Sequence, residues 1–137
     1  MHLLLIEDSG TLANLFRAQA RRLGNHSVTI AATKTKAIAA FQKEKFDIVF
    51  IDMGLEGIQD RGLQVLQEIK ALAPAQKTGI LSSNDLKNMV KASQENGAEF
   101  YMVKPFTYSG LKVVLEGDRE AIEHYQPDIS EGRIIVL

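Results

Sequence analysis

Residues 46–52 read FDIVFID, in which four consecutive apolar side chains are followed by an aspartate. A short apolar run of this kind is typical of a strand buried on both faces of a parallel sheet. Asp52 then lies at the carboxyl end of the expected strand, the edge at which open parallel α/β sheets bind their ligands. Taken alone, Asp52 is more simply explained as a cap of the next turn, so its interpretation depends on the rest of the chain.

Composition and charge exclude several classes of function. The chain has 137 residues, a formal net charge of −1 and no cysteine. This length suits one domain with a sizeable core, and the charge provides no general attraction to nucleic acid or anionic lipid. Disulfides, thiol catalysis and thiolate metal sites are excluded, and the three histidines show no metal-ligand spacing. The first apolar run, residues 3–6, is too short for a signal peptide or a membrane span, so a cytoplasmic protein is expected.

Similar apolar runs recur on both sides of residues 46–52 and alternate with segments of helical periodicity. Besides the strand at 48–51, strands are expected at residues 3–6, 27–31, 77–82 and 100–103. Helices are expected near 12–23, 33–43, 62–72 and 86–96, and a last helix starts near Ser109 and extends toward Ile122, although Gly117 disfavours its continuity. The alternation predicts an α/β fold, a doubly wound five-stranded parallel sheet with helices on both faces and right-handed crossovers.

Polar side chains follow four of the expected strands. They are Glu7 and Asp8 after the first strand, Asp52 after the third, Ser82 after the fourth and Lys104 after the fifth. Because the carboxyl ends of parallel strands share one edge, these side chains should converge. Three close carboxylates repel one another, and a hard cation such as Mg²⁺ relieves that repulsion. The cation and the lysine would neutralise a phosphoryl group on Asp52, to which the Ser82 hydroxyl would donate. Each residue alone is also explained as a cap or a solvated surface group, but their joint placement favours a site.

In this set of motifs the chain resembles the receiver domains of two-component response regulators, over roughly residues 2–116. The shared pattern is an acidic pair after strand one, an aspartate after strand three, a Ser or Thr after strand four and Lys-Pro after strand five. The stretch 100–106, FYMVKPF, is close to the sequence that the family usually has there. The resemblance implies the flavodoxin-like (βα)5 fold of the chemotaxis regulators, with strand order 2-1-3-4-5.

The resemblance also implies roles for particular residues. Asp52 would be the phospho-acceptor, with Lys104 and Ser82 assisting. Mg²⁺ would be bound by Asp8, Asp52, the Gly54 carbonyl and, through water, Glu7. Tyr101 would be the switch aromatic that turns inward when Ser82 moves toward the phosphoryl group, and the Lys104–Pro105 bond would be cis. A histidine kinase or phosphotransfer protein would supply the phosphoryl group, and a downstream protein or output domain would respond. Such a protein is a signalling switch with self-catalysed phosphoryl transfer and slow autodephosphorylation.

The loop that follows the third expected strand, from Asp52 to Gly62, departs from the family pattern. Glu56 stands where the family usually has proline, and the loop is about two residues longer than its commonest form. Alternative functions stay open at this point: a non-phosphorylated interaction module, or a Mg²⁺-dependent phosphohydrolase, which Gly54 disfavours because that class needs an acidic residue two positions after its nucleophile. Flavin or nucleotide binding is disfavoured because Glu7-Asp8 would repel a phosphate.

The last twelve residues extend past the expected receiver unit. We expect a receiver domain over 1–125 and a C-terminal extension over 126–137 that ends in the apolar run Ile134 to Leu137. A soluble chain would not leave such a run exposed. It should pack on its own domain as an extra strand or helix cover, pair with a second chain to give a homodimer, or link to an output domain.

Overall fold

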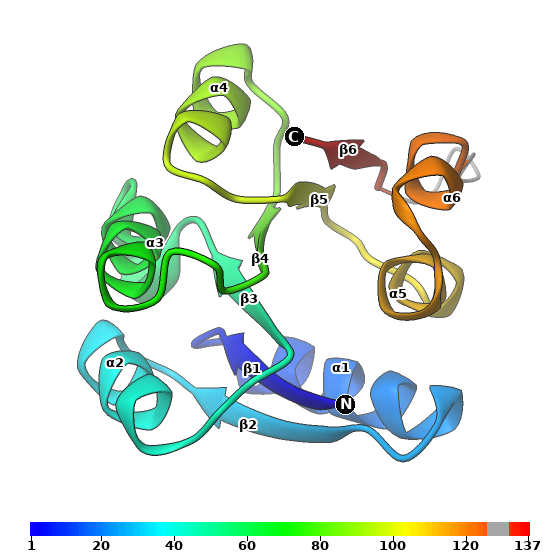
Figure 1. Ribbon diagram of the computed structural model, residues 1–137, viewed down its shortest axis with the longest axis horizontal. Coiled ribbons are helices and arrows are strands. Elements are labelled where there is room, and N and C mark those ends of the chain that lie inside the picture. The colour runs from blue at the N-terminus through cyan, green and yellow to red at the C-terminus, as the bar shows by residue number, and fades with distance from the viewer. Residues whose placement is uncertain (126–131) are drawn as a thin grey trace.

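One six-stranded sheet runs through the protein, with its strands in the order β2-β1-β3-β4-β5-β6 (Figure 1). The computed structural model describes residues 1–125 and 132–137. Within these ranges the strands are β1 (His2–Ile6), β2 (Ser27–Ala31), β3 (Ile48–Asp52), β4 (Thr78–Ser82), β5 (Phe100–Val103) and β6 (Ile134–Val136). Strands β1 to β5 are parallel, and β6 is antiparallel to β5.

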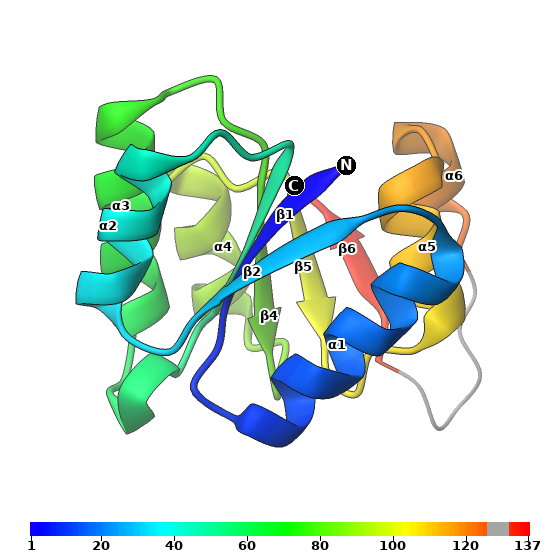
Figure 2. The same ribbon diagram turned by 90° about the horizontal axis from the view of Figure 1, so that it is seen from below.

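The helices and one short 3₁₀ turn connect these strands. They are α1 (Gly10–Leu23), α2 (Lys34–Lys43), η1 (Leu55–Gly57), α3 (Arg61–Leu72), α4 (Lys87–Glu95), α5 (Tyr108–Glu116) and α6 (Arg119–Glu123). Helices α2, α3 and α4 cover one face of the sheet, and α1 and α5 cover the other (Figure 2). The predicted parallel α/β sheet is therefore confirmed. In the described residues, no helix is both long and apolar enough to cross a membrane.

One detail of the prediction is wrong. The sheet has six strands, not five, because the apolar C-terminal run pairs with the edge of β5 that would otherwise carry unpaired backbone groups. The last predicted helix is interrupted at Gly117, the residue that disfavoured its continuity: α5 ends at Glu116 and α6 starts anew after Asp118. A Cβ on Gly117 would lie 2.6 Å from the Val113 carbonyl oxygen, so this close turn requires glycine.

Several helices start where a short polar side chain replaces a missing backbone partner. The side chains of Ser9, Thr33, Thr107 and Asp118 accept hydrogen bonds from the first-turn amides of α1, α2, α5 and α6. These N-caps are signals that the local sequence carries. They place the start of α1 directly after Glu7-Asp8, at the carboxyl edge of the sheet.

Both faces of the sheet are packed with apolar side chains. On the α1–α5 face, the rings of Phe16, Phe50 and Phe100 meet edge to face, with centroids 4.9 Å apart for Phe16–Phe50 and 5.6 Å for Phe50–Phe100. Gly79 of β4 makes room for this cluster, since a Cβ there would lie 1.9 Å from the Phe100 ring.

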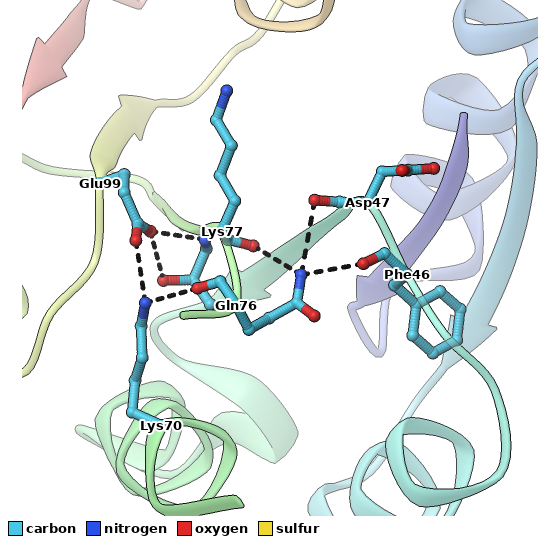
Figure 3. A network of polar contacts seen from close by, with 7 residues as sticks. Phe46, Asp47, Lys70, Gln76, Lys77 and Glu99 are labelled. Atoms are coloured by element: carbon cyan, nitrogen blue, oxygen red, sulfur yellow. Dashed lines mark hydrogen bonds and ion pairs between the residues drawn. The ribbon is translucent and has the colours of Figure 1, made fainter. Parts of the chain in front are cut away.

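A polar network ties the strands together at the amino edge of the sheet, opposite the candidate site (Figure 3). The Gln76 amide donates to the carbonyls of Phe46 and Lys77, each at 3.1 Å. Glu99 accepts hydrogen bonds from the Thr78 backbone at 2.6 Å and from the Lys70 ammonium at 2.9 Å. The network thus connects the starts of β3, β4 and β5 with α3, and this helps to set the strand register that aligns their carboxyl ends.

Candidate functional site

Three carboxylates meet at the carboxyl edge of the central strands. Glu7 and Asp8 follow β1, and Asp52 ends the neighbouring strand β3; one oxygen from each lies within 4.8 Å of the others. Glu7 and Asp52 are buried, whereas Asp8 is exposed. A cluster of oxygen ligands alone, part buried and part open to water, suits a hard divalent cation.

Lys104 lies against the same carboxylates. Its ammonium donates to Glu7 at 2.9 Å and to Asp52 at 3.1 Å. The lysine is placed there by the end of β5, where its backbone N–H donates to the Ser82 carbonyl at 2.7 Å, and the following bond to Pro105 is cis. Burial by itself would lower the pKa of Lys104, but the hydrogen bonds and charges of Glu7 and Asp52 raise it above its usual value, so the side chain stays an ammonium.

Glu7 is the carboxyl most perturbed by this crowding. Burial raises its pKa to about 7; the hydrogen bond from Lys104 opposes the rise, and the nearby Asp52 adds to it. A proton or a cation on this carboxylate relieves the same repulsion. The binding of a divalent cation here should therefore compete with protonation of Glu7.

A second part of the site is a chain of hydrogen bonds that connects Ser82, Asn84 and Tyr101. The Ser82 hydroxyl oxygen accepts a hydrogen bond from the Asn84 N–H at 3.4 Å, and the Tyr101 hydroxyl donates to the Asn84 carbonyl at 2.7 Å. The Tyr101 ring is fully buried. Strand β5 is thus connected by its tyrosine to the loop that follows Ser82.

A cavity of about 280 Å³ opens over these groups. Its lining residues come from the carboxyl ends of β3, β4 and β5 with the residues that follow them, from the loop between β3 and α3, and from α4: Asp52, Met53, Gly54, Gln59, Asp60, Ser82, Ser83, Asn84, Met89 and Lys104. Sequence reasoning did not identify Gln59, Asp60, Ser83 or Met89. The extra length of the loop was the available signal for the first two, but it does not reveal which side chains turn toward the site.

The β3–α3 loop passes very close to Asp52. A Cβ on Gly62 would lie 2.4 Å from the Asp52 carbonyl oxygen, so the start of α3 can approach the site only with glycine at this position. Glu56 and Asp60 both have φ of 60°, a left-handed conformation that is uncommon outside glycine. The Gly54 carbonyl accepts the Gly57 N–H at 3.0 Å and keeps a second lone pair for another ligand.

A family model for the response regulator receiver domain matches residues 3–116. This chain belongs to the receiver domain family. The match covers β1 to α5 and all the residues of the acidic cluster.

Curated relatives and solved structures show the same domain in longer and shorter proteins. The chain is 29% identical to the alginate biosynthesis transcriptional regulatory protein AlgB of Pseudomonas aeruginosa, over 81% of this chain and 24% of that protein. It is 26% identical to chemotaxis protein CheY-3 of Vibrio cholerae, over 85% of this chain and 89% of that protein. A response regulator from Burkholderia pseudomallei, solved with a phosphorylated aspartic acid, calcium and citrate, has a TM-score of 0.75 and 25% identity, covering 89% of this chain and 69% of that one. The chain thus spans about a quarter of the length of its first curated relatives.

The receiver domain brings together the residues that the sequence singled out. Glu7, Asp8, Asp52 and Lys104 form one cluster, Ser82 and Gly54 line the adjoining cavity, and Tyr101 reaches it through Asn84. The cis Lys104–Pro105 bond is as the resemblance implies. The roles of these residues in phosphoryl transfer are proposals, made below.

A test of the Glu7 environment follows from its raised pKa. Without divalent cations, a carboxyl group whose pKa is about 7 in the folded protein and ordinarily 4.5 contributes stability that is complete below pH 4.5 and is lost as the pH rises through 7. Glu7→Gln should remove this pH-dependent contribution. The free energy of unfolding of the wild type, relative to that of the variant, should therefore fall as the pH rises from 4.5 through 7. Urea unfolding at a series of pH values measures it, with the exposed Glu95→Gln as control. A wild-type-minus-variant difference that is flat with pH would contradict the assignment.

Proposed function

We propose that this receiver domain is a phosphorylation-dependent switch that accepts its phosphoryl group on Asp52. The observation that carries the proposal is the placement of Asp52, buried at the end of β3, with an ammonium 3.1 Å away and two further carboxylates beside it. In the transfer, an Asp52 carboxylate oxygen would attack phosphorus while the bond to the donor's leaving group breaks, which leaves an acyl phosphate. Attack of water on that phosphorus would release inorganic phosphate and restore Asp52.

The surrounding residues have separate tasks in this scheme. Lys104 would lie against a phosphoryl oxygen, and the Ser82 hydroxyl would donate to another. Asp8, Asp52, the Gly54 carbonyl and, through water, Glu7 would hold Mg²⁺, which supplies positive charge against the phosphoryl oxygens. Movement of Ser82 would be passed through Asn84 to Tyr101. This would make Ser82 and Tyr101 the switch pair.

The partners follow from the chemistry of the site. A histidine kinase or phosphotransfer protein would donate the phosphoryl group, as in a two-component phosphorelay in the cytoplasm. The output would be a downstream protein or an output domain, since the relatives of regulator type are about four times longer than their match to this chain. In this scheme residues 1–125 form the receiver unit and 126–137 its extension, and homodimerisation is one route of output.

Incubation with acetyl phosphate and Mg²⁺, followed by intact mass spectrometry, tests the proposal. We expect one added phosphoryl group, because a small acyl phosphate can replace the kinase when the domain itself supplies the catalytic groups. Excess chelator, present during the incubation, should prevent most of the adduct from forming. An adduct that forms equally well with chelator, or no adduct under any condition, would contradict the proposed function.

A further inference from the structure

Strand β6 closes the edge of the sheet next to the candidate site. It lies beside β5 (Figure 1) and pairs antiparallel with it. In this pairing Tyr101 is opposite Ile135 and Met102 is opposite Ile134. Backbone hydrogen bonds flank the ladder at both ends: Leu137 N–H to the Glu99 carbonyl at 3.0 Å, and Gly132 N–H to the Pro105 carbonyl at 3.0 Å. The C-terminal segment is thus held along the whole length of β5 and beyond it.

Apolar side chains of this segment complete both cores. Ile135 and Leu137 pack on the face that contains Tyr101, and Ile134 packs on the face that contains Met102 and Phe106. Residues directly opposite in an antiparallel pair share a face, so Ile135 lies beside the Tyr101 ring on its side away from β4. β6 therefore helps to keep this ring buried with its hydroxyl on Asn84.

The segment also holds the backbone that carries Lys104. The Val103 N–H donates to the Arg133 carbonyl at 2.8 Å, while the Lys104 N–H donates to the Ser82 carbonyl on the opposite side. Gly132 lies so close to this backbone that a Cβ on it would be 1.5 Å from the Val103 carbonyl oxygen. The Val103–Lys104 backbone is thus held between residues 132–133, which lead into β6, and the end of β4.

A third contact reaches the loop after Ser82. Arg133 forms an ion pair with Asp85, which stands one residue beyond Asn84. The segment 132–137, which contains β6, therefore contacts the residues beside both parts of the cavity that come from β4 and β5: Lys104 through Val103, and Asn84 through Tyr101 and Asp85. Lys104 and Asn84 line this cavity together with Ser82 and Asp52.

We propose that β6 is a positioning element of the phosphoryl site, and that docking of β6 on β5 and loading of Asp52 favour each other. The inference rests on the proposed function. Its physical basis is preorganisation: groups already held in place lose less conformational freedom when the ligand binds. Because linkage is reciprocal, loading of Asp52 must strengthen β6 docking by the same factor by which docking strengthens loading.

Gly132→Ala provides the sharpest test, because one methyl group collides with backbone and undocks the start of the segment. Gly10→Ala is the matched control, since a Cβ there meets no atom within 4 Å. The probe is beryllofluoride with Mg²⁺, and calorimetry gives its dissociation constant. We expect Gly132→Ala to weaken binding by roughly fivefold or more, in the range of ordinary coupling between sites, and Gly10→Ala to leave it unchanged.

Hydrogen exchange in the wild-type chain tests the reciprocal effect, which a purely stabilising role of β6 would not produce. The amides of Gly132, Leu137 and Val103 should gain protection on beryllofluoride loading by the factor that Gly132→Ala loses in affinity. If Gly132→Ala does not fold, Arg133→Ala, which removes the ion pair to Asp85, replaces it. Wild type that binds the probe without added protection of these amides, or a folded variant with unchanged affinity, overturns the inference. Wild type that does not bind the probe overturns the proposed function and this inference with it.

Discussion

Asp52→Asn should abolish the phosphoryl adduct formed with acetyl phosphate and Mg²⁺. The asparagine amide is nearly isosteric, so the end of β3 keeps its shape, but it lacks the anionic oxygen that attacks phosphorus. It also removes one carboxylate from the cluster of Glu7, Asp8 and Asp52, which weakens the cation site. Intact mass measures the adduct, and peptide mapping locates it in the wild type. This is the largest effect on activity that the structure predicts. Of the two described carboxylates that contact Lys104, Glu7 and Asp52, only Asp52 lines the cavity.

Asp47→Asn is the control for this experiment. Asp47 precedes the same strand at its other end and accepts the His2 N–H at 2.7 Å, far from the cavity. The variant should form the adduct at the wild-type level. A full adduct on Asp52→Asn would show that another group, such as Glu7, accepts the phosphoryl group. It would contradict the proposal that Asp52 is the phospho-acceptor.

Phe50→Ala should produce the largest loss of stability. The ring is fully buried in the middle of β3, two residues before Asp52, and it packs edge to face on Phe16 and Phe100. Truncation removes the burial of the ring and leaves a cavity that the sheet cannot close, for which about 3–5 kcal/mol of unfolding free energy is typical. Urea unfolding monitored by circular dichroism gives the change directly.

Leu72→Ala is the matched apolar control for Phe50→Ala. Leu72 is 51% exposed at the end of α3, so its truncation should stay within about 0.5 kcal/mol of wild type. A Phe50→Ala loss below about 1 kcal/mol, the centre of the distribution for ordinary substitutions, would show that the aromatic cluster is not the tightly packed core described here.

Features that depend on short stretches of chain could be predicted from the amino-acid sequence alone. Runs such as 48–51 are apolar because both faces of their strand are covered, and caps such as Ser9 and Thr33 mark helix starts through bonds to their own first turn. The parallel alternation of strands then brings Glu7, Asp52 and Lys104 to one edge. For this reason the residues of the acidic cluster, though not their distances, could be named before the structure was known.

Features that arise from contacts between distant segments could not be predicted in this way and became visible in the folded protein. The raised pKa of Glu7 comes from burial and from the nearby carboxylate of Asp52 on another strand, against the opposing hydrogen bond from Lys104, and no local pattern encodes these contacts. The pairing of β6 with β5 was one of several outcomes for an apolar tail, and it depends on a free sheet edge that exists only once the other strands are assembled. Gly62 and Gly132 look like ordinary loop glycines in the sequence; their need for glycine comes from backbone that approaches from β3 and β5. The physical reason is the same in each case: local propensity acts over a few residues, whereas burial, close approach and electrostatic coupling are set by which segments the fold places side by side.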